Sequence, residues 1–522
     1  MNTTTSPAGT FAEVWQRVVL RHDARTFLVF RGEDGRIDTW TYGEFDRVVR
    51  DAMALLAANG VVAGDAVHLC LRNSPAFIGL WLACTRLGAW MVPVDPASTS
   101  RDIESQLVRV SPKVGLYARE RAGTYRAGVA EGSRLRTFAL EETSADVRAG
   151  GRLRAGDGRT AEAAPVAPRD RLAVMFTSGT TSQPKGVVLT QANYRHVAEA
   201  MAAAADLGAD DRWLVTLPLF HANAQFYCFA PAIHVGASVA LTATFSASQW
   251  VDTATALGAT HASLFAAPIR MILARTPDGT APAHLRHTWF AQSLGRDHHR
   301  EFGALTGTLP RQLYGMTETT AIVTADRSDP PSHELIGEPV PGRRVRLVDP
   351  TTHEDVADGT PGMIIVAGER GVDLFAEYLD DRAVTDRSFT TDGDGVTWLL
   401  TGDLAVRTES GALRFVGRAD DVIKVAGENV SLTEVESVLA QAPGVLEVAV
   451  VARADALRDH VPVAYVVVRD QRAAPTEDEL AAWAGEQLAP QARPREWHFI
   501  DSLPRTSVGK VRRFKIGTDD VG

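Results

Sequence analysis

The sequence predicts an α/β protein with a large N-terminal domain of doubly wound sheets, a small β-rich subdomain and an α+β C-terminal domain. Three observations support this. In the N-terminal third, helical and strand-like patterns alternate, which favours parallel strands joined by helices. Residues 335–417 are rich in short strand patterns broken by Gly and Asp. Beyond residue 417, capped helices alternate with apolar strands.

The N-terminal pattern is clearest between residues 44 and 95. Apolar spacing predicts a helix at 44–60, where Gly60 is a good C-terminal stop, and then a strand at 66–71. A helix at 76–88 and a strand at 90–95 follow. From about residue 118 to 170 the composition turns to Ala, Gly, Arg and Glu with weak periodicity, so we expect mainly surface loop there.

The second half of the chain divides into two parts. The runs RRVRLVD, GMIIVAG and GALRFVG predict strands of the β-rich subdomain at about 335–417. Ser431 with Glu434, and Thr476 with Glu479, have the spacing of capping boxes that begin helices. Strands are expected at 445–453 and 461–468. We therefore expect an N-terminal domain of residues 1–419 and a C-terminal domain of residues 420–522.

Composition and charge exclude several classes of protein. A net charge of −10 and a pI near 5.8 argue against binding to a nucleic-acid backbone. No apolar run approaches the length of a membrane span, and no secretory signal is visible at the N-terminus. Cys70 and Cys84 lie in apolar surroundings and are expected to be reduced core residues. These features favour a cytoplasmic protein.

A polar, glycine-containing stretch, FTSGTTSQPKG at residues 176–186, is the first candidate for a binding loop. It is not a Walker loop, because Pro184 and Gly186 replace the expected Gly and Ser or Thr, and because both flanks look like strands. Its backbone N–H groups and hydroxyls could still surround an anion, with Lys185 neutralising the charge. The hydroxyls are those of Thr177, Ser178, Thr180, Thr181 and Ser182. In isolation the stretch would be an ordinary hydrophilic hairpin turn.

Four further motifs accompany this loop: YGMTET (314–319), TGD (401–403), GRADDVIKVAGENVSLTEVE (417–436) and LPRTSVGKVRR (503–513). Together they resemble the adenylate-forming superfamily of acyl-CoA synthetases, luciferases and peptide-synthetase adenylation domains. Ser182 and GENVS (427–431) are most similar to carnitine/crotonobetaine-type CoA ligases. The resemblance implies that an acid reacts with Mg-ATP to give an acyl-adenylate, that a nucleophile then displaces AMP, and that a mobile C-terminal domain turns between the two steps.

The resemblance also implies roles for individual residues. The loop at 177–185, Gly179 included, would hold the β- and γ-phosphates, and Glu318 would be the magnesium ligand. The other nucleotide-binding candidates are Thr317 at the α-phosphate, Tyr314 against the adenine, Asp403 at the ribose hydroxyls and Arg418 on the ribose or phosphate side. Lys510 would catalyse adenylation, Asp420 would be the hinge, and Gly427 would let the pantetheine arm of CoA pass.

For the acid-binding pocket, His221 matches an aromatic position that gates the place of the carboxylate. Further lining candidates by position are Asn223, Ala266, Gly315 and Met316. His298 and His299 are sequence neighbours that cannot share one helical face, so we interpret them as surface residues and not as a metal site.

Two departures from the family pattern concern the pocket and the CoA contacts: the segment FAQSLGR (290–296) and the surroundings of His460.

The first functional hypothesis is a ligase that joins a small or medium organic acid to CoA. The alternative is adenylation of a carboxylic or nitrous acid with transfer to an amine or carrier thiol, which includes diazotase-type chemistry. A third hypothesis, a non-catalytic homologue, is opposed by Lys185, Glu318, Asp403, Asp420 and Lys510. The sequence leaves the oligomeric state open.

Overall fold

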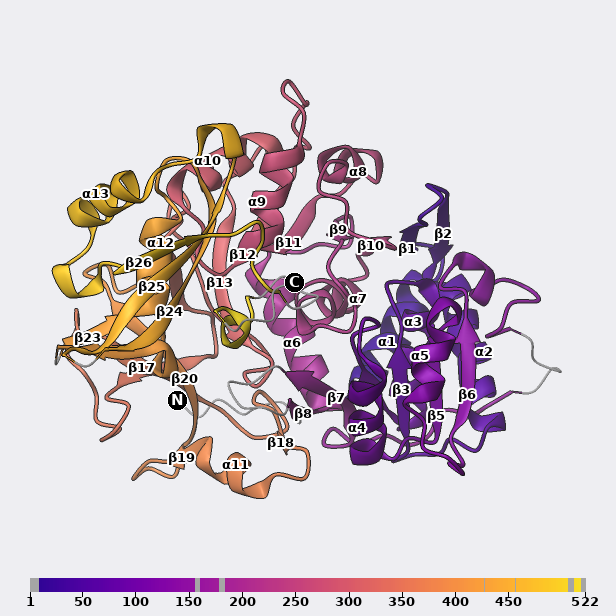
Figure 1. Cartoon of the computed structure of the whole chain (residues 1–522). Helices are drawn as coiled ribbons and strands as arrows, with labels where there is room; N and C mark the ends of the chain where they lie inside the picture. The colour runs from indigo at the N-terminus through magenta and orange to yellow at the C-terminus, as the bar shows by residue number, and fades with distance from the viewer. Residues whose placement is uncertain are drawn as a thin grey trace.

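The strands of the protein pair into three sheets (Figure 1). The computed structural model describes residues 9–154, 160–177, 184–426, 428–455, 457–505 and 511–517. The first sheet has 14 strands in the order β16-β17-β20-β21-β15-β14-β13-β12-β11-β9-β10-β1-β2, with β19 beside β20. Its strands are β1 (Thr26–Arg31), β2 (Ile37–Thr41), β9 (Arg212–Val215), β10 (Ser238–Thr242), β11 (His261–Phe265), β12 (His287–Ala291), β13 (Arg311–Met316), β14 (Ala321–Ala325), β15 (Leu335–Pro339), β16 (Arg344–Val348), β17 (Gly362–Ala367), β19 (Phe389–Thr391), β20 (Thr397–Arg407) and β21 (Leu413–Arg418).

The second sheet has seven strands in the order β18-β8-β7-β4-β3-β5-β6. They are β3 (Ala66–Cys70), β4 (Trp90–Pro93), β5 (Val114–Ala118), β6 (Arg136–Leu140), β7 (Arg171–Thr177), β8 (Lys185–Thr190) and β18 (Glu377–Tyr378). The predicted strand–helix–strand unit is confirmed: β3 and β4 are parallel and joined by α3 (Pro75–Leu87). The preceding helix α2 (Tyr42–Ala58) ends as predicted, with Gly60 in the left-handed region at φ +80°.

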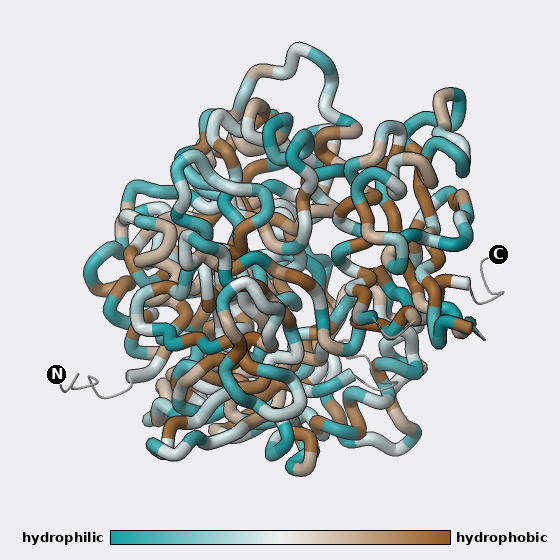
Figure 2. Tube along the Cα trace, turned by 90° about the vertical axis from the view of Figure 1, so that its left-hand side faces the viewer, coloured by the Kyte–Doolittle hydropathy of each residue, from teal (hydrophilic) through white to brown (hydrophobic). Residues whose placement is uncertain are grey.

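Helices cover both sheets and fill the space between them. The central layer packs into one hydrophobic core with both sheets. Its helices are α1 (Phe11–His22), α2, α3, α6 (Gln191–Ala204), the π-helix η3 (Asn223–Phe229) and α7 (Ala230–Val235). The outer face of the first sheet carries α8 (Trp250–Ala256), α9 (Ala266–Arg275) and α10 (Arg296–Thr306). The outer face of the second carries α4 (Ser100–Val110) and α5 (Ala122–Ala127). Hydrophilic stretches follow the outer turns of the chain (Figure 2).

The first sheet changes its winding direction at β9. Trp213 and Val215 of β9 face the central core, whereas Leu214 faces the outer core. The connection from β9 to β10 runs through η3 and α7 on the central side, and α8 then leads back across β9 to β11 on the outer side. Ligands of open α/β sheets bind outside the carboxyl ends of strands at such a switch point. The ends of β9 and β11 are therefore where a substrate is expected.

The segment at 118–170 is more structured than predicted. β6 pairs in parallel with β5, and the short helices η1 (Arg119–Arg121), α5 and η2 (Ser144–Val147) surround it. Tyr125 is fully buried, and its hydroxyl lies 2.9 Å from His68 Nδ1. The expectation of mainly surface loop was wrong for these elements, because their apolar positions are few and too irregularly spaced to show a period.

The strands of residues 335–417 are present as predicted, but they do not form an isolated sheet. β15 pairs with β14 and thereby extends the first sheet, whereas β18 joins the second sheet beside β8. The short helix α11 (Arg382–Arg387) lies between β18 and β19.

The third sheet has five strands, β23-β22-β25-β24 with β26 on β25. They are β22 (Val422–Val425), β23 (Glu428–Ser431), β24 (Val445–Asp455), β25 (Asp459–Val468) and β26 (Glu496–Phe499). α12 (Leu432–Leu439) and α13 (Glu477–Gln487) pack on it to form a core of their own. The described 3-10 turns of this region and of the connection before it are η4 (Ala419–Asp421), η5 (Gln471–Ala473), η6 (Pro490–Ala492) and η7 (Arg513–Lys515).

Candidate functional site

Two predicted residues of the acid pocket follow β9, and a third follows β11. The ring of His221 meets that of Phe265 edge-on, with 5.5 Å between centroids and an interplanar angle of 90°. Asn223 begins the π-helix η3, and its Nδ2 donates to Ser263 Oγ over 3.1 Å. Ala266, the first residue of α9, is fully buried. π-Helical turns are frequent at functional sites, and this one places Asn223 at the switch point of the sheet.

The other two pocket candidates end β13. Gly315 and Met316 are half-buried and precede the turn that contains Thr317 and Glu318. β13 runs parallel to β12, which pairs with β11, so all these ends lie at one edge of the sheet. The Thr319 hydroxyl accepts from Met316 N over 2.9 Å and holds the turn closed.

A chain of contacts links this turn to the glycine-containing loop on the second sheet. Glu318 is 6% exposed, and its Oε1 accepts a hydrogen bond from the Tyr378 hydroxyl over 2.9 Å. Lys185 Nζ lies 5.1 Å from the centroid of the Tyr378 ring. Burial and the Glu318 carboxylate both raise the pKa of Tyr378, so its hydroxyl stays a donor. Tyr378 therefore connects the predicted magnesium ligand to the predicted phosphate-binding lysine.

A buried arginine supports the turn from behind. Arg343 Nη2 donates to Thr319 O over 2.5 Å, and Nη1 donates to Asp373 O over 2.7 Å. Burial lowers the pKa of Arg343 to about 10, and Asp373 opposes that shift. Neither Tyr378 nor Arg343 was among the predicted residues. Tyr378 lies in a two-residue strand with no motif, and Arg343 begins a basic run that looks exposed.

The predicted phosphate loop connects two antiparallel strands. Thr177 at the end of β7 pairs with Lys185 at the start of β8, which confirms the strand flanks that ruled out a Walker loop. Ser178, Gly179, Thr180 and Thr181 lie outside the described residues.

Three predicted nucleotide residues form a second cluster. Both oxygens of Asp403 have partners, because the Tyr314 hydroxyl donates to Oδ2 over 2.7 Å and Arg418 Nη1 lies 3.5 Å from Oδ1. Tyr314 and Asp403 are both buried. Burial and the neighbouring carboxylate raise the pKa of Tyr314. The pKa of Arg418 is also raised, although burial opposes it, because Asp403, Asp420 and Asp421 lie nearby. Asp403 is thus held by two donors from β13 and β21.

The remaining predicted residues concern the C-terminal part. Asp420 is exposed and lies in η4, between β21 of the first sheet and β22 of the third. Gly427 and Lys510 lie outside the described residues. The segment that contains Lys510 is flanked by an isolated antiparallel bridge between Arg505 and Val511.

The interpretation of His298 and His299 as surface residues was wrong, because both side chains are buried. His299 Nε2 lies 2.7 Å from Pro310 O, and Arg469 Nη2 lies 2.5 Å from His298 Nε2. Burial, Arg469 and Arg270 lower the pKa of His298 to about 4. Among the described residues, no group of three or more His, Cys, Asp or Glu side chains could hold a metal ion.

Two doubly wound sheets followed by a smaller third sheet are the architecture of an adenylate-forming enzyme. A family model described as AMP-binding enzyme matches residues 15–379, and a model of the AMP-binding enzyme C-terminal domain matches residues 434–510. The first match covers more than half of the 522 residues. The chain belongs to this family, and it is an ATP-dependent, AMP-forming ligase.

Curated relatives match over nearly their whole length. A crotonobetaine/carnitine–CoA ligase of Proteus mirabilis is 28% identical over 512 residues, which covers 96% of this chain and 97% of the relative. One from Escherichia coli O157:H7 is also 28% identical, over 521 residues with the same coverage. The resemblance to carnitine/crotonobetaine-type ligases is thereby confirmed.

Solved structures share the fold. ATP-bound MatB from Rhodopseudomonas palustris has a TM-score of 0.85 and 26% identity, over 96% of this chain and 97% of that chain. The anthranilate CoA ligase AuaEII in complex with anthranoyl-AMP has a TM-score of 0.87 and 23% identity, over 99% and 98% of the two chains. None of the helices that the structure describes is both long and apolar enough to cross a bilayer.

Proposed function

We propose that the protein activates a small or medium organic acid as an acyl-adenylate and transfers the acyl group to CoA. The main observation behind this proposal is that Tyr378 contacts both Lys185, through its ring, and Glu318, through its hydroxyl. It joins the end of the polar loop on one sheet to a buried carboxylate on the other, beside strand ends where a switch point places substrates. The names of the curated relatives, crotonobetaine/carnitine–CoA ligases, support acid–CoA ligation.

In the first step an oxygen of the substrate carboxylate attacks the α-phosphorus of ATP, a P–O bond forms, and pyrophosphate leaves. Such a step depends on positioning and on stabilising charge on the phosphate oxygens. Lys185 would stabilise the departing pyrophosphate together with Thr177, Ser178, Gly179, Thr180 and Thr181. Thr317 and Lys510 would act at the α-phosphate, where a compact ammonium can also reach the substrate carboxylate.

Other residues would hold the two substrates. The two oxygens of Asp403 fit a pair of ribose hydroxyls, since a carboxylate accepts at both oxygens, and Arg418 and Tyr314 hold that carboxylate in place. His221, Asn223, Ala266, Gly315 and Met316 would surround the acid, with His221 at the position of its carboxylate. Burial of Asn223 and Ala266 agrees with an enclosed acid pocket.

The residues present fit a magnesium ion that arrives with ATP. Mg²⁺ in such enzymes takes one or two carboxylates together with substrate phosphates, and Glu318 supplies one buried carboxylate beside Lys185 and Tyr378. When bound, the ion would neutralise charge on the phosphate oxygens. Tyr378 would orient the Glu318 carboxylate toward it.

In the second step the CoA thiolate sulfur attacks the acyl carbonyl carbon, the C–S bond forms and AMP leaves. Gly427 would leave room for the pantetheine arm, because a residue without Cβ keeps a narrow passage open. Gly427→Leu should therefore block thioester formation while pyrophosphate release continues.

Mass spectrometry of products formed with ATP, Mg²⁺ and candidate acids tests the proposal, with CoA or amines offered as acceptors. Wild type should give acyl-CoA and AMP. Gly427→Leu should accumulate the acyl-adenylate. An acyl-adenylate that forms while CoA is never acylated and an amine is consumed would reject the ligase and favour the alternative acceptor.

A further inference from the structure

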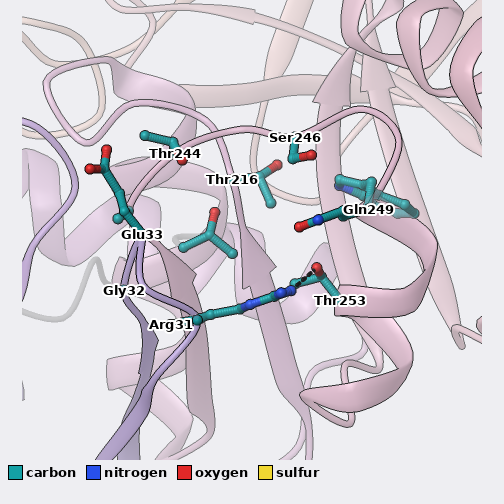
Figure 3. A pocket seen from close by; sticks show the side chains of 12 residues that line it. Arg31, Gly32, Glu33, Thr216, Thr244, Ser246, Gln249 and Thr253 are labelled. Atoms are coloured by element: carbon teal, nitrogen blue, oxygen red, sulfur yellow. Dashed lines mark hydrogen bonds between the residues drawn. The ribbon is translucent and has the colours of Figure 1, made fainter.

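A small pocket whose lining residues include none of the site candidates described above lies at the carboxyl ends of β1, β9 and β10 (Figure 3). These strands are parallel neighbours. Arg31 is the last residue of β1, Thr242 is the last of β10, and Thr216 comes directly after β9. Another side is closed by Trp250 and Thr253 of α8 and by Gln249, which directly precedes this helix. The volume is about 80 Å³, well above the roughly 10–15 Å³ that a cavity needs to hold one water.

The cation of this pocket, Arg31, has no counter-charge among the residues that the structure describes. Arg31 Nη1 donates to Thr253 Oγ1 over 2.5 Å, and no carboxylate in the described part of the chain forms an ion pair with the guanidinium. Glu33, the one acidic lining residue, pairs with Arg72 at 2.9 Å. Figure 3 shows its carboxylate on the side of the pocket away from the guanidinium. An arginine side chain offers five N–H donors and no acceptor. Most donors of Arg31 therefore make no hydrogen bond to a described residue.

Two buried polar groups in the wall also lack partners. Thr242 Oγ1 and Trp250 Nε1 make no hydrogen bond to any described residue, although the side chains are only 7% and 1% exposed. Unsatisfied buried donors are rare and each costs about 1–3 kcal/mol. Both residues line the pocket, but each of these two atoms exposes less than 1 Å², so the acceptor oxygens of a ligand would reach them only after the side chains shift.

We propose that this pocket binds a small oxyanion, either a phosphate or the carboxylate of a small organic acid. The indole N–H of Trp250 and the free donors of Arg31 require acceptors, and the hydroxyls of Thr242 and Thr253 can donate to the same oxygens. The pocket is distinct from the phosphate loop, because Thr177 and Lys185 belong to the second sheet. Its lining residues include none of the acid-pocket candidates, although Thr216 follows the same strand β9 as His221 and Asn223.

The first experiment measures the melting temperature as a function of inorganic phosphate, acetate and glycolate, at ionic strength held constant with sodium chloride. A ligand that binds only the folded state raises the melting temperature with concentration. Wild type should show this rise with at least one anion. Arg31→Gln should lose it, since the affinity falls about 10-fold or more when a charged donor is removed. Arg36→Gln, an exposed arginine on the same hairpin, removes an equal charge and should keep it.

Two conservative variants distinguish an anion bound inside the pocket from an anion that is attracted to Arg31 by charge alone. Thr242→Val keeps the shape but removes the hydroxyl, and Trp250→Phe removes the indole N–H; each should weaken the anion measurably in isothermal titration calorimetry. Phosphate bound at Lys185 would survive Arg31→Gln, so only the part lost in that variant counts. The proposal is overturned if no anion stabilises wild type, if Arg31→Gln and Arg36→Gln respond alike, or if Thr242→Val and Trp250→Phe both bind as wild type.

Discussion

At the residue scale, the hydrogen bond from the Tyr378 hydroxyl to Glu318 is a contact that the sequence does not predict. Glu318 and Asp403 are site candidates from the sequence because each lies in a recognisable motif. Tyr378 is 60 positions from Glu318 and on the strand that joins the other sheet. No local pattern encodes such a contact, since it depends on how two sheets approach each other.

We predict that Tyr378→Phe weakens the response to Mg²⁺. The ring and its contact with Lys185 remain, but Glu318 loses a donor that fixes its orientation. The concentration of Mg²⁺ for half-maximal pyrophosphate release should rise by about 10-fold or more, in line with one hydrogen bond to a charged group. The ATP–pyrophosphate exchange rate at increasing Mg²⁺ measures this. Tyr465→Phe, on β25 of the third sheet, is the matched control, and an unchanged Mg²⁺ dependence in Tyr378→Phe would exclude the positioning role.

At the scale of elements, the strands flanking the polar loop and the units around β3 and β4 could be predicted because their periodicity is local. The packing of α10, in contrast, could not be predicted from the sequence. His298 and His299 are adjacent on it, and both are buried. The ring of His299 packs against Phe290 of β12, whereas His298 meets Arg469, which comes directly after β25. Sequence spacing predicts one buried helix face, and it cannot predict that a distant segment covers a second.

The contact between His298 and Arg469 predicts a pH-dependent stability. Arg469 donates to His298 Nε2, so the contact requires a neutral ring. Burial, Arg469 and Arg270 lower the pKa of His298 to about 4, against Asp297, from an ordinary value near 6.5. The unfolded chain therefore takes up the proton first. The contribution of His298 is fully present above about pH 6.5 and is lost as the pH falls toward 4.

His298→Gln keeps an acceptor for Arg469 but cannot titrate. We expect the melting temperature of wild type to fall more steeply than that of His298→Gln between pH 7 and pH 5. Several other buried histidines titrate in both proteins, so the difference between the two curves is the quantity to measure. His460→Gln replaces an exposed histidine and should follow wild type. Parallel curves for wild type and His298→Gln would contradict the argument.

At the scale of the whole molecule, the third sheet and its helices have their own core, and polar contacts between described residues join them to the first sheet. The Ser431 hydroxyl donates to Val416 O over 2.8 Å, and Arg469 meets His298. Polar interfaces of this kind permit domains to move. We propose that residues 1–419 and 420–522 are the two bodies, as the sequence suggested, and that they turn about Asp420 between the two steps.

Lys510→Ala should separate the two half-reactions. If the ammonium stabilises charge only during adenylation, pyrophosphate release should fall by about 100-fold or more, as for other charge-stabilising groups. The same variant should still convert a supplied acyl-adenylate to the thioester. Lys515→Ala removes an exposed charge from the same C-terminal segment and serves as the control. Adenylation at the wild-type rate in Lys510→Ala would remove this lysine from the mechanism.

Asp420→Pro tests whether the C-terminal body rotates about η4, the short connection between β21 of the first sheet and β22 of the third. Proline fixes φ near −65° and removes the N–H, so it restricts rotation at the one exposed position of η4. One half-reaction should persist, because one arrangement of the two bodies stays accessible, while the other half-reaction collapses. Asp420→Asn removes the charge without restricting the backbone and should support both. Pyrophosphate release and thioester formation from supplied acyl-adenylate are measured separately for each variant. Equal loss of both activities in a folded Asp420→Pro protein would mean that the pivot lies elsewhere.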